Sequence, residues 1–91
     1  MKTVWKQPLD ITDIQQIYLP EGAEILSCAM QFNLPTIWFL VDAEPKGPLV
    51  EHVFRIAGTG HLIEEDRLQY IGTVHDVPLG LVWHLFEVTD E

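Results

Sequence analysis

The segment Gly58-Thr59-Gly60-His61 is the part of the chain that most resembles a ligand-binding loop. A dinucleotide fingerprint would need a third glycine where the chain has Ile63, and a P-loop would need Gly-Lys-Ser/Thr. The acidic residues at positions 64–66 would also repel a phosphate. We therefore predict a strand-ending turn whose glycines permit a positive φ, with a backbone clamp for a ligand as the alternative.

Four histidines raise the question of a metal site: His52, His61, His75 and His84. They form neither a His-Glu-x-x-His motif nor a close His-x-His pair, whereas tetrahedral zinc needs three or four ligands in one place. We therefore expect no metal and no cofactor. His52 and His84 fall in the middle of strand-like runs, where we expect local hydrogen bonds to the ring.

Nucleophilic catalysis has no clear signature in the chain. Cys28 and Ser27 lie inside a strand-like run rather than on a sharp turn, and no Gly-x-Ser-x-Gly motif is present. His75 and Asp76 are adjacent, and adjacent residues of a strand point to opposite faces. We assign no catalytic residue, and we interpret Cys28, the only cysteine, as an inert buried thiol.

The aromatic residues are the better indication of a binding site. They exceed what one small core easily buries, and they comprise Trp5, Trp38, Trp83, Tyr18, Phe39, Tyr70 and Phe86, among others. An exposed tryptophan or tyrosine can anchor a protein interface or stack on a flat ligand. The residues that we predict to bind a ligand or partner are Gly58, Thr59, Gly60, His61, Trp38, Trp83 and His84.

The elements that must position these residues read as short strands. Runs rich in β-branched and aromatic residues, separated by proline, glycine and asparagine, cover residues 3–9, 14–19, 24–32, 37–42, 49–57, 69–75 and 81–88. No run has the length of a crossover helix, so an antiparallel sheet is favoured. We predict a mainly β fold, a compact antiparallel sheet folded as a small sandwich or partly open barrel, with at most one short helical turn.

Alternation within three of these runs predicts which side chains share a face. In the run 24–32 we place Leu26, Cys28, Met30 and Phe32 on one face, with a turn over 33–36 after it. The runs 37–42 and 81–88 are apolar on both faces, which is typical of central strands covered on each side. So short a chain meets that demand either as a two-layer sandwich or with a partner subunit that buries Trp38 or Trp83.

Size and charge exclude several classes of function. The chain has 91 residues, which is the size of one domain covering 1–91. Five Lys+Arg against fourteen Asp+Glu give a net charge of −9, so we expect binding neither to nucleic acid nor to anionic membrane surfaces. No run is long enough to span a bilayer, and the N-terminus lacks the apolar run of a secretory signal. A cytoplasmic location is therefore expected.

Short motifs along nearly the whole chain resemble those of small proteins from bacteriophages and their bacterial hosts, a family catalogued only as a domain of unknown function. The first group of motifs is Leu19-Pro-Glu-Gly-Ala23, Ile25-Leu-Ser27, Gln31, Pro35, Trp38 and Leu40-Val-Asp42. The second group is Phe54-Arg55, Gly58-Thr59-Gly60, Tyr70-Ile-Gly-Thr73 and Val82-Trp-His-Leu-Phe-Glu87. The resemblance implies a phage or prophage setting and the host cytoplasm, where many small acidic phage proteins act by binding.

Together these observations favour a small acidic binding protein that engages a host protein or sequesters a small ligand, without catalysis, and that associates with itself. Two alternatives remain open at this point. One is a small hydrolase or metal-dependent enzyme that uses His61, His75 or His84. The other is a structural or virion-associated oligomer.

Overall fold

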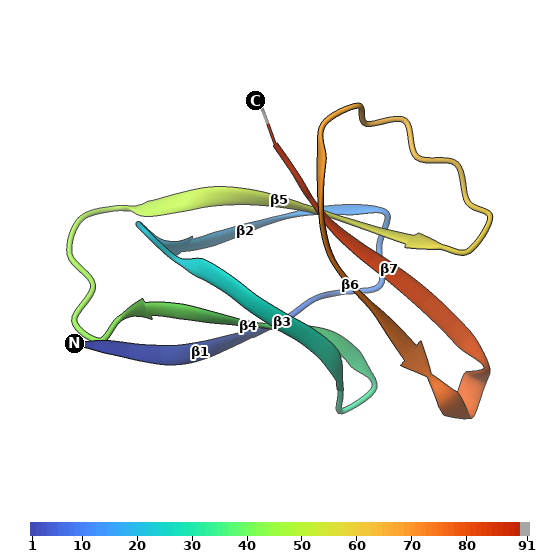
Figure 1. Ribbon diagram of the computed structural model, residues 1–91, viewed down its shortest axis with the longest axis horizontal. Coiled ribbons are helices and arrows are strands. Elements are labelled where there is room, and N and C mark those ends of the chain that lie inside the picture. The colour runs from blue at the N-terminus through green and yellow to red at the C-terminus, as the bar shows by residue number, and fades with distance from the viewer. Residues whose placement is uncertain (90–91) are drawn as a thin grey trace.

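The computed structural model describes residues 1–89, whose regular structure is almost entirely β-strand (Figure 1). The elements in chain order are β1 (Lys2–Pro8), β2 (Ile14–Pro20), β3 (Glu24–Gln31), β4 (Leu34–Asp42), β5 (Leu49–Gly58), β6 (Leu68–Asp76), the 3₁₀ turn η1 (Val77–Leu79) and β7 (Leu81–Val88). The predicted mainly β fold with at most one short helical turn is confirmed, and each predicted strand run corresponds to one strand of the structure.

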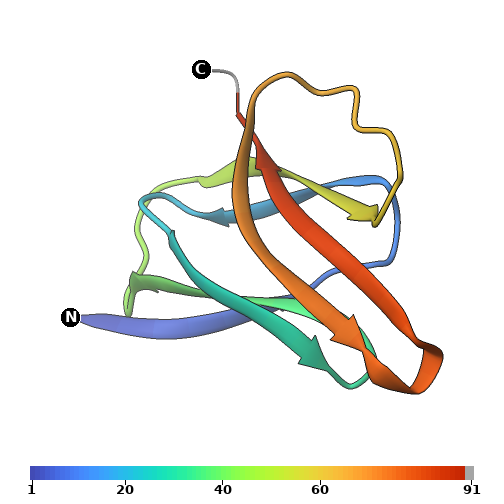
Figure 2. The same ribbon diagram turned by 45° about the vertical axis from the view of Figure 1, so that its right-hand side comes forward.

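The strands form two antiparallel sheets that face each other. The three-stranded sheet has the order β1-β4-β3, and the four-stranded sheet has the order β2-β5-β7-β6. The chain passes from one sheet to the other after β1, β2 and β4, and the edge strands β3 and β6 lie beside each other, which closes one side of the sandwich (Figures 1 and 2). As predicted, β4 and β7 are central strands.

A single apolar core fills the space between the sheets. Its buried members are Leu9, Leu19, Ile37, Phe39, Val41, Phe54, Ile56, Val74 and Leu85. The alternation of Ile37, Phe39 and Val41 on β4 places all three inside, as the period of a strand requires. Leu9 lies just after β1, where its backbone N–H donates to the carbonyl oxygen of Pro35 over 2.8 Å. That bond holds the connection from β1 to β2 against the core.

On the closed side, a glycine lets β3 and β6 approach closely. A Cβ built on Gly72 would lie 2.5 Å from Sγ of Cys28, so no larger residue fits there without movement. The register of β6 against β7 shifts between Tyr70 and Gly72, which places a bulge at this glycine, as is typical of glycine inside a strand. Burial between the strands raises the pKa of the Cys28 thiol, which agrees with its interpretation as an unreactive side chain.

A second bulge overturns one predicted face of β3. The register against β4 shifts between Ile25 and Ser27, so the alternation expected from the sequence changes phase there. Ile25 packs against the core together with Cys28 and Met30, whereas Leu26 is half exposed. The prediction that Leu26 shares a face with Cys28 was therefore wrong, because one inserted residue reverses the assignment of all residues on one side of it.

The hairpin between β3 and β4 is also tighter than predicted. Phe32 and Asn33 both have positive φ, of 50° and 66°, and form a two-residue turn of the kind that matches the twist of the flanking strands. The expected turn over 33–36 is mostly strand, because β4 already begins at Leu34 and includes Pro35. Phe32 was expected on a strand face, but it is 86% exposed at the tip.

The long connection from β5 to β6 contains no helical turn and is fastened to the sheet by a buried arginine. Arg55 is 8% exposed, and its Nε donates to Oε1 of Glu65 over 2.9 Å. Its remaining nitrogens donate to the backbone carbonyls of Asp13, Ile56 and Leu62. Because Asp13 directly precedes β2 and Leu62 lies in the connection, Arg55 joins the start of β2 to the acidic loop.

Only one face of the three-stranded sheet is covered by the described residues. Trp38 and Leu40 of β4 point away from the core and remain partly exposed. We expected both faces of this strand to be covered, but the described residues cover only the face toward the core. Within residues 1–89, no helix has the length and apolar character that a membrane span requires.

Candidate functional site

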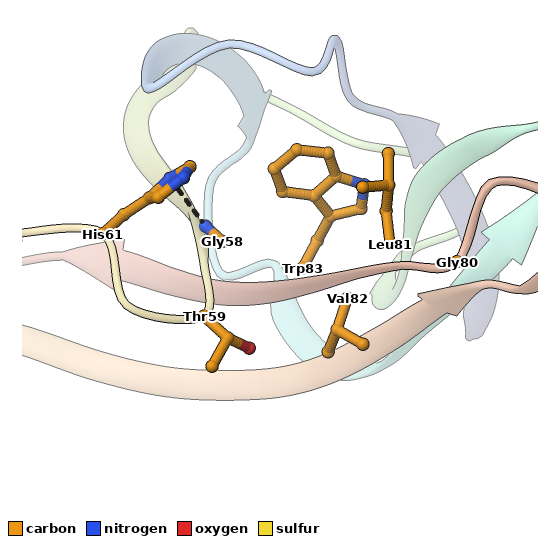
Figure 3. Close-up of a pocket in the computed structure, with 7 residues that line it drawn as sticks. All are labelled: Gly58, Thr59, His61, Gly80, Leu81, Val82 and Trp83. Carbon is orange, nitrogen blue, oxygen red and sulfur yellow. Dashed lines mark hydrogen bonds between the residues drawn. The ribbon is translucent and has the colours of Figure 1, made fainter.

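A pocket of about 270 Å³ lies at the end of the four-stranded sheet, where β5 ends and β7 begins (Figure 3). The residues that line it are Gly58, Thr59, His61, Gly80, Leu81, Val82 and Trp83. Two turns therefore form its walls, the one that ends β5 and the one that leads from η1 into β7. Four of the seven predicted binding residues belong to this lining.

The turn that ends β5 is closed by His61. The backbone N–H of His61 donates to the carbonyl of Gly58 over 3.0 Å, and Gly60 takes a φ of +90° that favours glycine. In return, the N–H of Gly58 donates to Nδ1 of His61 over 3.2 Å. Because Nδ1 accepts this bond, the neutral ring carries its proton on Nε2, which leaves that N–H as a donor.

The imidazole of His61 depends on the missing side chain of Gly58. A Cβ at Gly58 would lie 2.9 Å from Cε1 and 3.1 Å from Nδ1 of the ring. Gly58 pairs with Trp83 of β7 across the sheet. His61 and Trp83 stand on the same side of these strands in Figure 3, whereas Thr59 and Val82 point to the other side. The glycine thus allows an imidazole and an indole to border one cavity.

Trp83 carries the most unusual polar group of the site. Its indole packs against the core, and its Nε1 is buried without a hydrogen-bond partner among residues 1–89. A buried donor without an acceptor costs about 1–3 kcal/mol. Natural proteins leave few such groups, and each of them calls for a physical explanation.

His84 lies on the opposite face of β7 and belongs to a chain of hydrogen bonds. Its Nε2 is 2.8 Å from Oγ1 of Thr59, and its Nδ1 is 3.0 Å from Oγ1 of Thr73. Thr73 in turn contacts the hydroxyl of Tyr70 over 2.6 Å. Thr59 therefore connects the pocket lining to His84. These two parts of the predicted site lie on opposite faces of β7 and are linked through this threonine.

The arrangement at His84 does not resemble a catalytic triad. In a triad, one imidazole nitrogen bonds to the nucleophile and the other to a carboxylate that orients and stabilises the ring. At His84 both nitrogens contact threonine hydroxyls. The mid-strand histidines make the local bonds that we expected, since His52 also pairs with Glu87, over 2.6 Å between Nδ1 and Oε2.

The metal-dependent alternative also finds no support in the geometry. No group of three or more His, Cys, Asp or Glu in the described part of the chain is placed to hold a metal ion. His75 is exposed on the edge strand β6, opposite Val82, whereas His61 is engaged by Gly58.

Trp38 does not belong to the pocket. It lies on the central strand of the three-stranded sheet and points away from the core, whereas the pocket is built on the four-stranded sheet. Conversely, no sequence pattern indicated that Gly80, Leu81 or Thr73 would join the site or its surroundings. Their roles depend on the pairing of β6 with β7 and of β5 with β7, which alternation within one strand does not reveal.

Residues 1–91 match the family described as Domain of unknown function (DUF7352), and the chain belongs to that family. No curated protein and no solved structure matches the chain. The family description assigns no activity, so the function has to be argued from the pocket itself.

Proposed function

We propose that the protein is a non-catalytic binding protein that holds a small, flat ligand in the pocket between His61 and Trp83. The buried Nε1–H of Trp83 is the observation that carries this proposal. Less than 1 Å² of this atom is exposed, so a ligand atom can accept a hydrogen bond from it only after a small movement of the surrounding side chains; that bond would then remove a cost of about 1–3 kcal/mol that the unliganded protein bears. Flat ligands are favoured because an indole face offers a stacking surface.

The polarity of the pocket narrows the class of ligand. The Nε2–H of His61 and the Nε1–H of Trp83 are both donors, so the ligand should present acceptors such as ring nitrogens or carbonyl oxygens. The net charge of −9 opposes the approach of anions. A neutral heteroaromatic molecule with two acceptors satisfies both conditions, and a pocket of about 270 Å³ is at the small end of the range for ligand sites.

The test is a titration followed by NMR, with nicotinamide, uracil and adenine as probes. Each of the three tryptophans gives one indole N–H signal, and Trp83→Phe identifies the signal of Trp83. We expect at least one probe to shift this signal in a saturable manner. Trp83→Phe keeps an aromatic face but removes the donor, so it should weaken binding roughly 5- to 100-fold, measured on the backbone amide signals of the pocket because this variant has no Trp83 indole signal. The matched control is Trp5→Phe, which changes an exposed tryptophan of β1 and should leave binding unchanged.

Gly58→Ala provides an independent test of the same pocket. The added Cβ would displace the ring of His61, so this variant should lose probe binding while it stays folded. His75→Ala serves as its control, because His75 is exposed and lies outside the pocket lining. If none of the three probes shifts the Trp83 signal up to about 10 mM, which corresponds to a binding free energy of about 3 kcal/mol, the proposal is contradicted.

We also infer a phage or prophage setting and a cytoplasmic location, and both rest on the resemblance of the motifs rather than on the pocket. In that setting the ligand would be a small molecule of the host cell. Genes for phage functions should then flank the coding sequence. Flanking genes of ordinary cellular metabolism would contradict the setting but not the binding site.

A further inference from the structure

The outer face of the three-stranded sheet is an apolar surface that no other strand of residues 1–89 covers. Trp38 and Leu40 of β4 are partly exposed there, next to Val4 of β1, which is 51% exposed, and Ala29 of β3, which is exposed. No strand of the described chain packs on this surface. We call these four residues the β4 face.

The charges around the β4 face differ from those of the rest of the chain. By strand alternation Lys2 and Lys6 of β1, Glu24 of β3 and Asp42 of β4 share this face, so its formal charges balance. The whole chain carries −9, with only five Lys+Arg. Most of the surface of one copy would repel a second copy of this acidic chain, but the β4 face would not, because its formal charges balance.

From these observations we propose that two copies of the protein form a dimer through their β4 faces. The proposal is independent of the ligand pocket, which lies on the other sheet. Face-to-face sheets pack about 10 Å apart, and a twofold axis within the interface relates the two copies. We expect the β4 face to bind a second copy of the same chain. The face combines apolar side chains with charges of both signs, so each copy can offer the opposite charge to the other.

Charge decides the direction of the twofold axis. An axis along β4 places β1 of one copy over β3 of the other, so Lys2 lies near Glu24 of the second copy, and the reverse pair forms as well. An axis across the strands places β1 over β1 and brings Lys2 near Lys6. The first arrangement pairs opposite charges, whereas the second opposes like charges.

The first arrangement also has consequences for two other side chains. It brings the two Trp38 side chains together at the axis, where indole rings can stack. Lys6 takes little part in the charge pairing, because its Nζ is held within its own chain by Oε1 of Gln31 at 2.6 Å and lies 5.5 Å from the ring centroid of Phe32. Lys2 and Glu24 therefore carry the predicted pairs.

The dimer should be reversible. Three strands about 4.8 Å apart make a face roughly 14 Å wide, which gives an interface at the small end of those seen in specific complexes. Association should therefore depend on concentration over the micromolar range, so sedimentation has to be measured across concentrations.

The experiment compares the association of five proteins by sedimentation velocity. The wild type should shift from monomer to dimer with rising concentration. Leu40→Lys places like charges at the axis and should weaken association at least 100-fold. Its circular dichroism spectrum, and its Tm at concentrations where both proteins are monomeric, should be unchanged because the side chain points outward. Val77→Lys is the matched control, since Val77 is 79% exposed on η1 and lies off the face.

Charge exchange tests the axis itself. Lys2→Glu should weaken the dimer about tenfold, since two symmetric pairs change from attraction to repulsion. The double variant Lys2→Glu with Glu24→Lys should restore most of the loss. A wild type that stays monomeric up to about 1 mM, which corresponds to roughly 4 kcal/mol of association free energy, overturns the dimer. If Leu40→Lys associates as strongly as the wild type, or if assemblies larger than a dimer form, this interface is contradicted. If the double variant does not recover association, the axis along β4 is contradicted.

Discussion

Replacing Gly72 by alanine should destabilise the protein through one identifiable contact. The new Cβ would lie 2.5 Å from Sγ of Cys28, whereas nonbonded heavy atoms in protein interiors prefer about 3.5–4.0 Å. The two strands that carry these residues are the edge strands that close the sandwich. Either the thiol must rotate or the sheets must separate by roughly 1 Å, and overpacking of this kind costs about 1–3 kcal/mol.

The backbone at Gly72 does not by itself require glycine, because this residue is not among the glycines with positive φ. Alanine in an extended strand should even gain about 0.5–1 kcal/mol from the reduced entropy of the unfolded chain. The clash with Cys28 is therefore the only destabilising contribution that the structure identifies. If Sγ is removed first, Gly72→Ala should become neutral or slightly stabilising.

A double-mutant cycle with Cys28→Ala measures this contribution. Urea unfolding of the wild type, Gly72→Ala, Cys28→Ala and the double variant should give a favourable coupling of about 1–3 kcal/mol between the two substitutions. Each kcal/mol corresponds to a change in Tm of roughly 4–8 °C for a domain of this size. Equal destabilisation by Gly72→Ala in both backgrounds would refute the close approach of β3 and β6.

Three further predictions test other parts of the fold. Arg55→Met should cost about 3–5 kcal/mol in urea unfolding, because it leaves a carboxylate and three carbonyls without their donor, whereas exposed Lys46→Met should change stability by less than about 0.5 kcal/mol. Phe32→Asn combined with Asn33→Gly should raise the unfolding free energy by about 0.5–1 kcal/mol, since both residues have positive φ; a lower Tm would contradict the assigned turn. Burial raises the pKa of the Cys28 thiol above its ordinary value of 9.0, so the folded state favours the neutral thiol. This preference contributes fully to the free energy of unfolding at pH values below the pKa of the thiol in the unfolded chain. It is lost as the pH rises through the folded pKa, so the wild type should lose stability above about pH 9 relative to Cys28→Ala, and parallel pH profiles would contradict this.

Local sequence patterns were sufficient to predict most of the strands and much of the core. Proline, glycine and asparagine mark the ends of the runs, and the alternation of residues within 37–42 and 49–57 agrees with the core positions of Phe39, Phe54 and Ile56. The bulge at Gly72 was also predictable, since glycine inside a β-prone run indicates a bulge or a close approach, and the structure has both.

The errors arose where one residue changes the phase of a strand. The bulge between Ile25 and Ser27 contains neither glycine nor proline, so nothing in the sequence indicates it. The turn at Phe32 and Asn33 was placed too late, because phenylalanine is uncommon at positive φ and Pro35 attracts a turn assignment. In both places the requirements of pairing with β4 outweighed the preferences of single residues.

The candidate site could be predicted only in part for the same reason. The turn residues Gly58, Thr59 and His61 were recognisable together, because they are close in the sequence. That Trp83 rather than Trp38 borders them depends on the register that sets Trp83 opposite Gly58. Both tryptophans lie in runs that are apolar on both faces, so composition does not distinguish them.

Two glycines of the four-stranded sheet make room for side chains of other segments, yet their replacement should have different effects. Gly72 faces Cys28 between the two sheets, where the neighbour is confined by packing on the core. Gly58 faces the imidazole of His61 at an exposed turn, so an added methyl group can push the ring outward. Alanine at position 72 should therefore lower stability, whereas alanine at position 58 should mainly abolish ligand binding. A Gly58→Ala variant that unfolds as readily as Gly72→Ala would show that His61 supports the fold rather than the pocket.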